Sequence, residues 1–134
     1  MSGPNPTPLA ERRCVRCEPG TPPIGESAIP ALLAQLPGWT LGEADGHKLL
    51  TRTFKFKGFM PAVDFVNRIA PIAEAEGHHP DLLLGWGYVT VQLWTHAAGG
   101  LTDNDFILAA KVDQVEYTPR NLRFRGDPVE SPKS

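Results

Sequence analysis

Residues 58–80 read GFMPAVDFVNRIAPIAEAEGHHP, and this stretch predicts the main helix of the protein and the two histidines that follow it. Gly58 opens the helix. The predicted apolar stripe consists of Phe59, Val63, Val66, Ala70 and Ala73, widened by Phe65, Ile69 and Ile72. Gly77 is a natural helix terminator, so His78 and His79 are expected just beyond the helix end.

The adjacent histidines indicate proton chemistry on a small molecule. Histidine is the side chain that most readily exchanges protons near neutral pH. A helix turns about 100° per residue and a strand alternates its faces, so His78 and His79 cannot share one face of a regular element. At the end of an element they can instead approach one ligand from two directions. Glu74 precedes this pair by one helical turn, and His96 and Asp105 follow it.

Strand patterns flank the main helix on both sides. Residues 39–41 begin one strand and residues 48–56 form a second, joined by a turn at 43–46 into a hairpin. Residues 82–86 and 88–95 form another pair that turns at Gly87. In the last strand one face carries Val89, Val91 and Leu93, and the other carries Tyr88, Thr90, Gln92, Trp94 and His96. This second face is aromatic enough to predict a subunit interface.

Two further helices complete the pattern. Ser27 can cap a short helix over residues 27–36, whose stripe is Ile29, Leu32, Leu33 and Leu36. Thr102 opens the last helix, which is expected to run to about Tyr117. The order α-β-β-α-β-β-α predicts an α+β fold in which a four-stranded antiparallel sheet carries three helices on one face.

The chain is expected to contain one domain with two irregular ends. Residues 1–26 are rich in proline, residues 27–118 form the domain, and residues 119–134 form a polar tail. The 134 residues are 41% hydrophobic, which is enough for a core, and the net charge of −2 argues against binding to nucleic acid or an anionic membrane. Without a long apolar run or a signal-peptide pattern, a cytoplasmic protein is expected.

The segment Cys14-Val-Arg-Cys17 is a separate motif. A zinc site usually needs four ligands, and this pair supplies two. A redox pair is expected in a strand-helix context, which the proline-rich segment does not provide. The favoured interpretation is an incidental or labile thiol pair.

The chain resembles the pterin-4a-carbinolamine dehydratase family from about Leu36 to Val115. The resemblance rests on the spacing of Glu74, His78-His79-Pro80, Trp86, His96 and Asp105. It implies a hydro-lyase that converts 4a-hydroxytetrahydrobiopterin to quinonoid dihydrobiopterin and water, recycling tetrahydrobiopterin for aromatic amino-acid hydroxylases. It also implies a homodimer or homotetramer that needs no metal or other cofactor. One animal branch of the family serves as a dimerisation cofactor for a hepatocyte homeodomain factor.

The resemblance also assigns roles to residues. His78, His79 and His96 match the catalytic histidines, while Glu74, Asp105 and Trp39 match residues of the substrate pocket. Glu74 lies four residues before His78, so the two side chains could touch if the helix persists. The run from Thr102 to Asp105 is also typical of a capping box, and the two roles of this aspartate can coexist.

Two other functions compete with dehydration. The same fold could serve as a noncatalytic pterin-binding or protein-binding dimerisation scaffold. The departures from the family pattern at residues 82–84 and at Ala97 are compatible with such a scaffold. The histidines with Glu74 and Asp105 could also hold a metal in a hydrolase. The intact set of three histidines favours the dehydratase over the scaffold.

Overall fold

The computed structural model of the chain describes residues 7–115 and has the predicted α+β class. The elements are α1 (Ile29–Leu33), β1 (Thr40–Ala44), β2 (His47–Lys55), α2 (Phe59–Glu76), β3 (Asp81–Gly85), β4 (Tyr88–Leu93) and α3 (Asp103–Asp113). Short 3-10 helices lie at Leu9–Glu11, Glu26–Ala28 and His96–Ala98. The order of helices and strands therefore follows the order predicted from hydrophobic periodicity.

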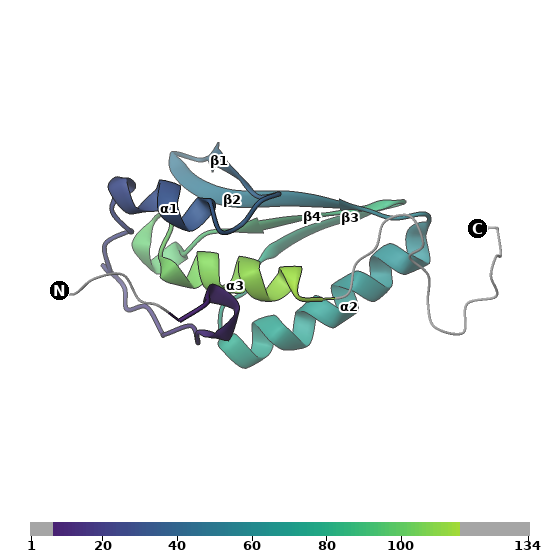
Figure 1. Cartoon of the computed structure of the whole chain (residues 1–134). Coiled ribbons are helices and arrows are strands. Elements are labelled where there is room, and N and C mark those ends of the chain that lie inside the picture. Colours follow the sequence, from purple (N-terminus) through teal and green to yellow (C-terminus); the bar gives the residue numbers. More distant parts are fainter. Residues whose placement is uncertain (1–6, 116–134) are drawn as a thin grey trace.

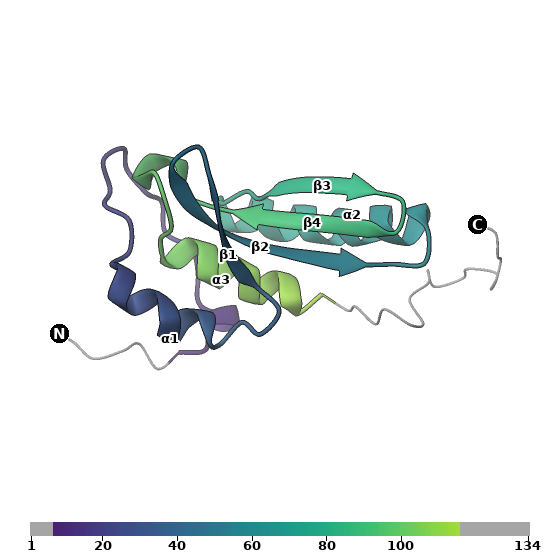
Figure 2. The ribbon, with the colours of Figure 1, turned by 90° about the horizontal axis from the view of Figure 1, so that it is seen from above.

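The four strands form one antiparallel sheet in the order β1-β2-β4-β3. The chain leaves β2, crosses through α2 and returns as the edge strand β3, and β4 then inserts between them. The register pairs Phe54 of β2 with Val89, and Leu82 of β3 with Val91. Figures 1 and 2 show α2 and α3 against one face of this sheet, with α1 on the same side near β1.

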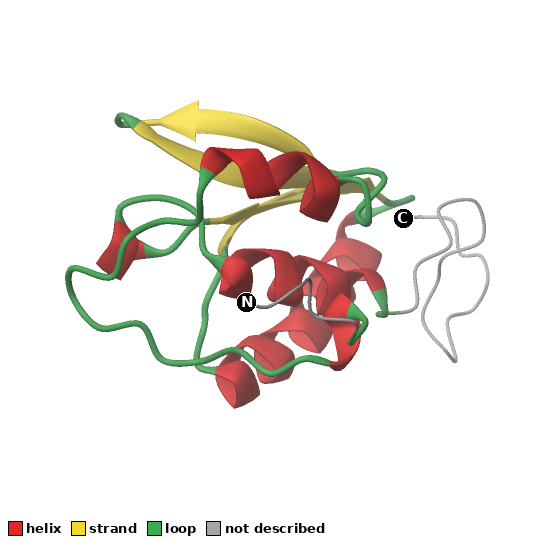
Figure 3. Cartoon of the chain, turned by 60° about the vertical axis from the view of Figure 1, so that its left-hand side comes forward, coloured by secondary structure: helices red, strands yellow, loops and turns green. Residues whose placement is uncertain are grey.

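The core lies between the sheet and these helices, which form the two layers seen in Figure 3. Val89, Val91 and Leu93 of β4 are fully buried, as their predicted common face requires. The Phe54 and Phe65 rings join sheet and helix, with their centroids 4.6 Å apart. Leu9, from the segment that precedes residue 27, is also buried in this core.

The buried face of α2 differs from the predicted stripe. Its buried residues are Ala62, Phe65, Ile69 and Ala73, whereas Phe59 is 46% exposed and Ala70 is exposed. The predicted main stripe was therefore wrong at Phe59 and Ala70 but correct at Ala73, and the widening residues Phe65 and Ile69 carry most of the packing. Apolar residues cover so much of this helix that periodicity alone could not select the face that meets the sheet.

Several boundaries also differ from their predictions. Ser27 does not cap a helix; it lies in the 3-10 helix Glu26–Ala28, and α1 begins at Ile29 with Pro30 in its first turn. Trp39 precedes β1 rather than beginning it. Helix α3 ends at Asp113, and the expected end near Tyr117 and the polar tail lie outside the described residues.

The open face of the sheet is less aromatic than predicted. Tyr88 is half-buried because its ring lies over Gly85, where a Cβ atom would approach the ring to 2.3 Å. Trp94 lies beyond the end of β4, at the site described below. Within residues 7–115, no helix has both the length and the apolar character needed to span a bilayer.

Candidate active site

The C-terminal end of α2 determines where His78 lies. Gly77 adopts the left-handed conformation, with φ 66° and ψ 26°. Its N–H donates to the carbonyl of Glu74 at 3.3 Å, and the N–H of His78 donates to the carbonyl of Ala73 at 3.2 Å. This pair of bonds is the Schellman motif, which ends the helix and fixes the backbone of the first histidine.

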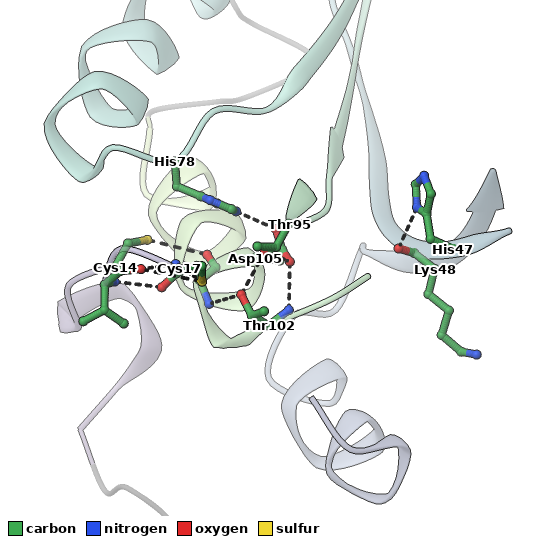
Figure 4. Close-up of polar contacts among 10 residues, drawn as sticks. Cys14, Cys17, His47, Lys48, His78, Thr95, Thr102 and Asp105 are labelled. Atoms are coloured by element: carbon green, nitrogen blue, oxygen red, sulfur yellow. Dashed lines mark hydrogen bonds and ion pairs between the residues drawn. The ribbon is translucent and has the colours of Figure 1, made fainter. Parts of the chain in front are cut away.

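His78 is held by Asp105, which comes from the first turn of α3. The Nε2 atom of His78 lies 2.6 Å from Oδ1 of Asp105, whose side chain is fully buried. The other oxygen, Oδ2, accepts from the hydroxyl of Thr95 at 2.8 Å and from the backbone N–H of Thr102 at 3.0 Å. Figure 4 shows His78 and Thr95 meeting at this carboxylate. A carboxylate only accepts hydrogen bonds, so Nε2–H of His78 is the donor.

Asp105 is at the same time a helix-capping residue, as the sequence predicted. Thr102 is the N-cap of α3; its hydroxyl accepts from the N–H of Asn104, and Asp105 accepts from the N–H of Thr102. Thr95 uses its hydrogen on Asp105, so the 2.8 Å contact between the two threonine hydroxyls has Thr102 as donor. Asp105 thus uses one oxygen for the helix and the other for His78.

His79 lies on the outer side of the histidine pair. Its Nε2 atom is 2.9 Å from Oε1 of Glu74, and both side chains are largely exposed. The anticipated contact of Glu74 with His78 is therefore replaced by a contact with His79. The left-handed turn at Gly77 takes His78 off the helical path, toward α3.

His96 belongs to a stack of three aromatic rings. The centroid of the His96 ring lies 3.8 Å from that of Trp94. The centroid of the His47 ring lies 3.5 Å from that of Trp94, so both histidines stack on this tryptophan. The interplanar angles are 28° and 18°. His47 is half-buried, and its Nδ1–H donates to the carbonyl of Lys48 at 3.3 Å (Figure 4). The stack restricts the orientation of His96.

The three histidines line one cavity of about 570 Å³, a volume typical of small-molecule sites. His78, His79, His96 and Trp94 contribute to its wall, and so does Asp81 at the start of β3. Asp105 lies behind His78 rather than in the wall, and Glu74 is also absent from the lining. Of the six predicted site residues, the histidines therefore meet at the cavity and Asp105 supports one of them.

Trp39 lies elsewhere. It is buried in the core, packs edge-on against Phe54 with centroids 6.2 Å apart, and donates from Nε1 to both oxygens of Asp113 at 3.0 Å. It does not line the cavity. Within residues 7–115, Trp39 supports the packing of α3 on the sheet, and the expected pocket role is corrected accordingly.

Glu76 is a site residue that the sequence analysis missed. Its side chain is only 7% exposed and accepts from the N–H of Cys14 at 2.8 Å and from Nε of Arg13 at 3.0 Å. Burial by itself would raise the pKa of Glu76, but these bonds and the charge of Lys111 outweigh it and hold that pKa below its ordinary value. The signal was present: Glu76 follows Ile69 and Ala73 along the buried stripe, where a carboxylate needs partners.

The five residues Arg13–Cys17, here called the strap, cross from Glu76 to Asn104. Cys14 Sγ lies 3.6 Å from the carbonyl of Asn104, and Cys17 Sγ lies 3.5 Å from its Nδ2 (Figure 4). Burial, reinforced by the Glu76 carboxylate, raises the pKa of the Cys14 thiol to about 12. Cys14 is therefore a poor nucleophile, and both thiols are free. Across residues 7–115, no three His, Cys, Asp or Glu side chains are grouped to hold a metal.

Known proteins resemble this chain in sequence, and a solved structure resembles it in fold. A sequence model of the family "Pterin 4 alpha carbinolamine dehydratase" matches residues 22–115. Proteins named pterin-4-alpha-carbinolamine dehydratase from Rickettsia canadensis and Chlorobaculum tepidum are 49% and 47% identical, over 80% and 81% of this chain and 96% and 98% of their own length. The crystal structure of a transcriptional coactivator/pterin dehydratase from Brucella melitensis is 36% identical, with a TM-score of 0.62 over 69% of this chain and 96% of that chain.

Proposed function

The chain belongs to the pterin-4a-carbinolamine dehydratase family, a family of hydro-lyases, and from this premise we propose that its cavity converts 4a-hydroxytetrahydrobiopterin to quinonoid dihydrobiopterin and water. The observation that carries the proposal is the buried bond of 2.6 Å between His78 and Asp105 at the wall of a cavity that two further histidines share. Three imidazole rings, the side-chain type best suited to proton transfer, thereby line one small-molecule site.

The reaction requires two proton transfers. The C4a hydroxyl leaves as water after it receives a proton, and a ring nitrogen gives up a proton. His78 donates Nε2–H to Asp105, which leaves Nδ1 as the nitrogen that can exchange a proton with a bound molecule. The carboxylate fixes this orientation, as the aspartate of a catalytic triad does for its histidine.

His79 is the second group of the proposed acid–base pair. Its exposed ring pairs with Glu74 at the outer side of the cavity, so it can reach a bound pterin from another direction than His78. His96, held against Trp94, closes the site. Acid–base catalysis of this kind contributes about 10²–10⁴-fold to a rate.

The decisive experiment is a stopped assay of carbinolamine dehydration with the wild-type protein and with His78→Ala. The wild type should accelerate the uncatalysed reaction, and the variant should lose about 10²-fold or more of that acceleration. Asn67→Ala, a change at an exposed position on α2 outside the cavity lining, is the matched control. A wild type without acceleration would overturn the proposal and favour a noncatalytic scaffold.

We further propose a physiological setting for this reaction. The enzyme acts in the cytoplasm and recycles tetrahydrobiopterin beside an aromatic amino-acid hydroxylase. Support for this setting comes from the resemblance to the dehydratase family. An extract that loses hydroxylation capacity when the protein is removed, and regains it when the pure protein is added, would support it; unchanged capacity would contradict it.

We also propose a homodimer or homotetramer. Leu83 and Trp86, in and just after the edge strand β3, are 60% and 68% exposed. An edge strand presents unpaired backbone groups, and exposed apolar side chains beside it favour association. Light scattering should give a multiple of 14.6 kDa for the wild type and a smaller mass for a Leu83→Asp, Trp86→Ala double variant. A monomeric wild type would refute the oligomer.

A further inference from the structure

The strap contributes to the cavity although it lies before the residues that the family model matches. That match begins at residue 22, whereas Val15, Arg16 and Cys17 line the same cavity as the three histidines. The cavity of this chain therefore has a wall from a segment that neither the histidine motif nor the predicted domain includes. The backbone of this wall and its side chains decide what it can bind.

Two buried side chains fix the backbone of the strap. Asn104 is 3% exposed; its Oδ1 accepts from the N–H of Val15 at 2.9 Å, and its Nδ2 donates to the carbonyl of Val15 at 2.6 Å. The carboxylate of Glu76 accepts a hydrogen bond of 2.8 Å from the N–H of Cys14, which precedes Val15 in the strap. Asn104 precedes Asp105 in the first turn of α3, so one turn of helix holds both the strap and His78.

Arg16 is the charged residue that this backbone presents to the cavity. It lies between Val15 and Cys17, which both contact Asn104. Arg16 is exposed, and within residues 7–115 it makes neither an ion pair nor a hydrogen bond. Asp81 also lines the cavity, but it forms no ion pair with Arg16. By contrast, Arg13 in the same strap pairs with Glu76.

We propose that Arg16 is a substrate-binding residue that donates hydrogen bonds to an oxygen of the bound pterin, either the 4-oxo group or a hydroxyl of the side chain. This inference rests on the proposed function of the cavity. A guanidinium is a planar fork of N–H donors and suits a flat ligand with oxygen acceptors. Because Asn104 and Glu76 already order the strap, binding does not have to fix this backbone.

Steady-state kinetics of Arg16→Gln and Arg68→Gln test the inference. Arg68 pairs with Asp64 on α2 and does not line the cavity, so its variant removes the same charge elsewhere. Arg16→Gln should raise KM about five- to tenfold with little change in kcat, because the contact is to bound substrate and not to the reacting atoms. Arg16→Lys should recover part of the loss. Equal KM values for the two glutamine variants would overturn the inference.

A 6,7-dimethyl substrate identifies the acceptor, because it keeps the 4-oxo group and lacks the side-chain hydroxyls. A KM increase that persists with this substrate assigns the 4-oxo group; an increase that disappears assigns the side chain. An increase with neither substrate contradicts the contact.

Equilibrium binding separates this inference from the proposed function. Titration of the wild type and Arg16→Gln with oxidised biopterin, which cannot be dehydrated, should show Kd weakened about five- to tenfold in the variant. A wild type that binds in this way without dehydrating would remove the proposed function and keep the role of Arg16. A wild type that dehydrates while the variant binds equally well would remove only the role of Arg16.

Discussion

His78 and Asp105 are 27 residues apart in the sequence, yet Nε2 of His78 lies 2.6 Å from Oδ1 of Asp105. The Schellman turn at Gly77 sends His78 toward α3, and the capping box at Thr102 holds Asp105 with its second oxygen. Two helix ends, one terminating and one beginning, thus meet at a single carboxylate. Substitutions at Asp105 and Thr102 should therefore separate the structural from the catalytic part of this arrangement.

Asp105→Asn should lower both stability and activity. The amide replaces an oxygen that accepts from His78 or from the capping box, so kcat should fall about 10²-fold and the free energy of unfolding should fall by about 2–3 kcal/mol. Thr102→Ala, which removes the capping hydroxyl alone, should cost about 1 kcal/mol with a much smaller effect on kcat. Dehydration rates and urea unfolding measure both quantities. Equal kcat losses in the two variants would mean that Asp105 acts only through the helix.

His79→Ala should lower kcat far more than Glu74→Gln does. His79 belongs to the cavity wall, whereas Glu74 does not line the cavity and pairs with His79 in an exposed contact that solvent screens. We expect about a 10²-fold loss for the histidine variant and less than a tenfold loss for the glutamate variant. Full activity in His79→Ala would remove that residue from the mechanism.

Gly77→Ala should destabilise the fold by about 1–2 kcal/mol. The space around Gly77 is open, with nothing within 4 Å of an added Cβ, so the cost comes from the left-handed backbone at φ 66°. Gly25→Ala is the matched control because its surroundings are equally open and its φ is −64°. Thermal unfolding of both variants checks the expectation. Equal melting temperatures would show that the turn is not strained by a side chain.

Glu76→Gln should destabilise the protein at neutral pH and have less effect in acid. A carboxyl whose folded pKa lies below its unfolded value stabilises the fold above the unfolded value, and this contribution is lost as the pH falls through the folded pKa. The difference in unfolding free energy between wild type and variant should therefore shrink as the pH falls below about 4.3. Urea unfolding across this range provides the measurement.

Glu11→Gln is the control for that experiment, since Glu11 is an exposed glutamate of the same N-terminal segment. Its effect should be small at every pH. A pH-independent difference for Glu76→Gln would mean that its charge does not hold the strap.

Trp94→Ala should reduce kcat/KM without unfolding the protein. Trp94 supports the His96 ring at 3.8 Å and lines the cavity, so its loss frees His96 and removes part of the wall. Trp94→Phe should retain part of the function because a ring remains to stack. Circular dichroism and dehydration kinetics test this together. Unchanged kinetics in Trp94→Ala would show that His96 needs no such support.

Much of the fold could be predicted because its causes are local. Alternating residues such as Val89 and Val91 predicted a half-buried strand, and both are fully buried. Turn residues separated the strands, and the class of the fold followed from the order of elements. The buried face of α2 could not be predicted, because Val63 and Phe65 are both apolar and only the position of the sheet selects one of them.

The local parts of the candidate site could be predicted, whereas the contacts between distant segments could not. The capping box from Thr102 to Asp105 spans one turn and was visible in the sequence. The partner of His78 was not visible in the sequence, because Glu74 lies at a suitable spacing four residues before it. Asp105 becomes the partner only because α3 packs beside the end of α2. Asn104 and Glu76 were missed because their partners in the strap lie 89 and 62 residues away in the sequence.

By itself, the sequence determined the α+β class, the end of the main helix at Gly77, the pair of histidines beyond it and the resemblance to the dehydratase family. These features depend on backbone preferences and periodicities over a few residues. Only the tertiary structure decided that Asp105 rather than Glu74 holds His78, that Trp39 is a core residue, and that the strap adds Val15, Arg16 and Cys17 to the cavity wall. Those contacts depend on how helices and strap pack together, which spacing along the chain does not encode.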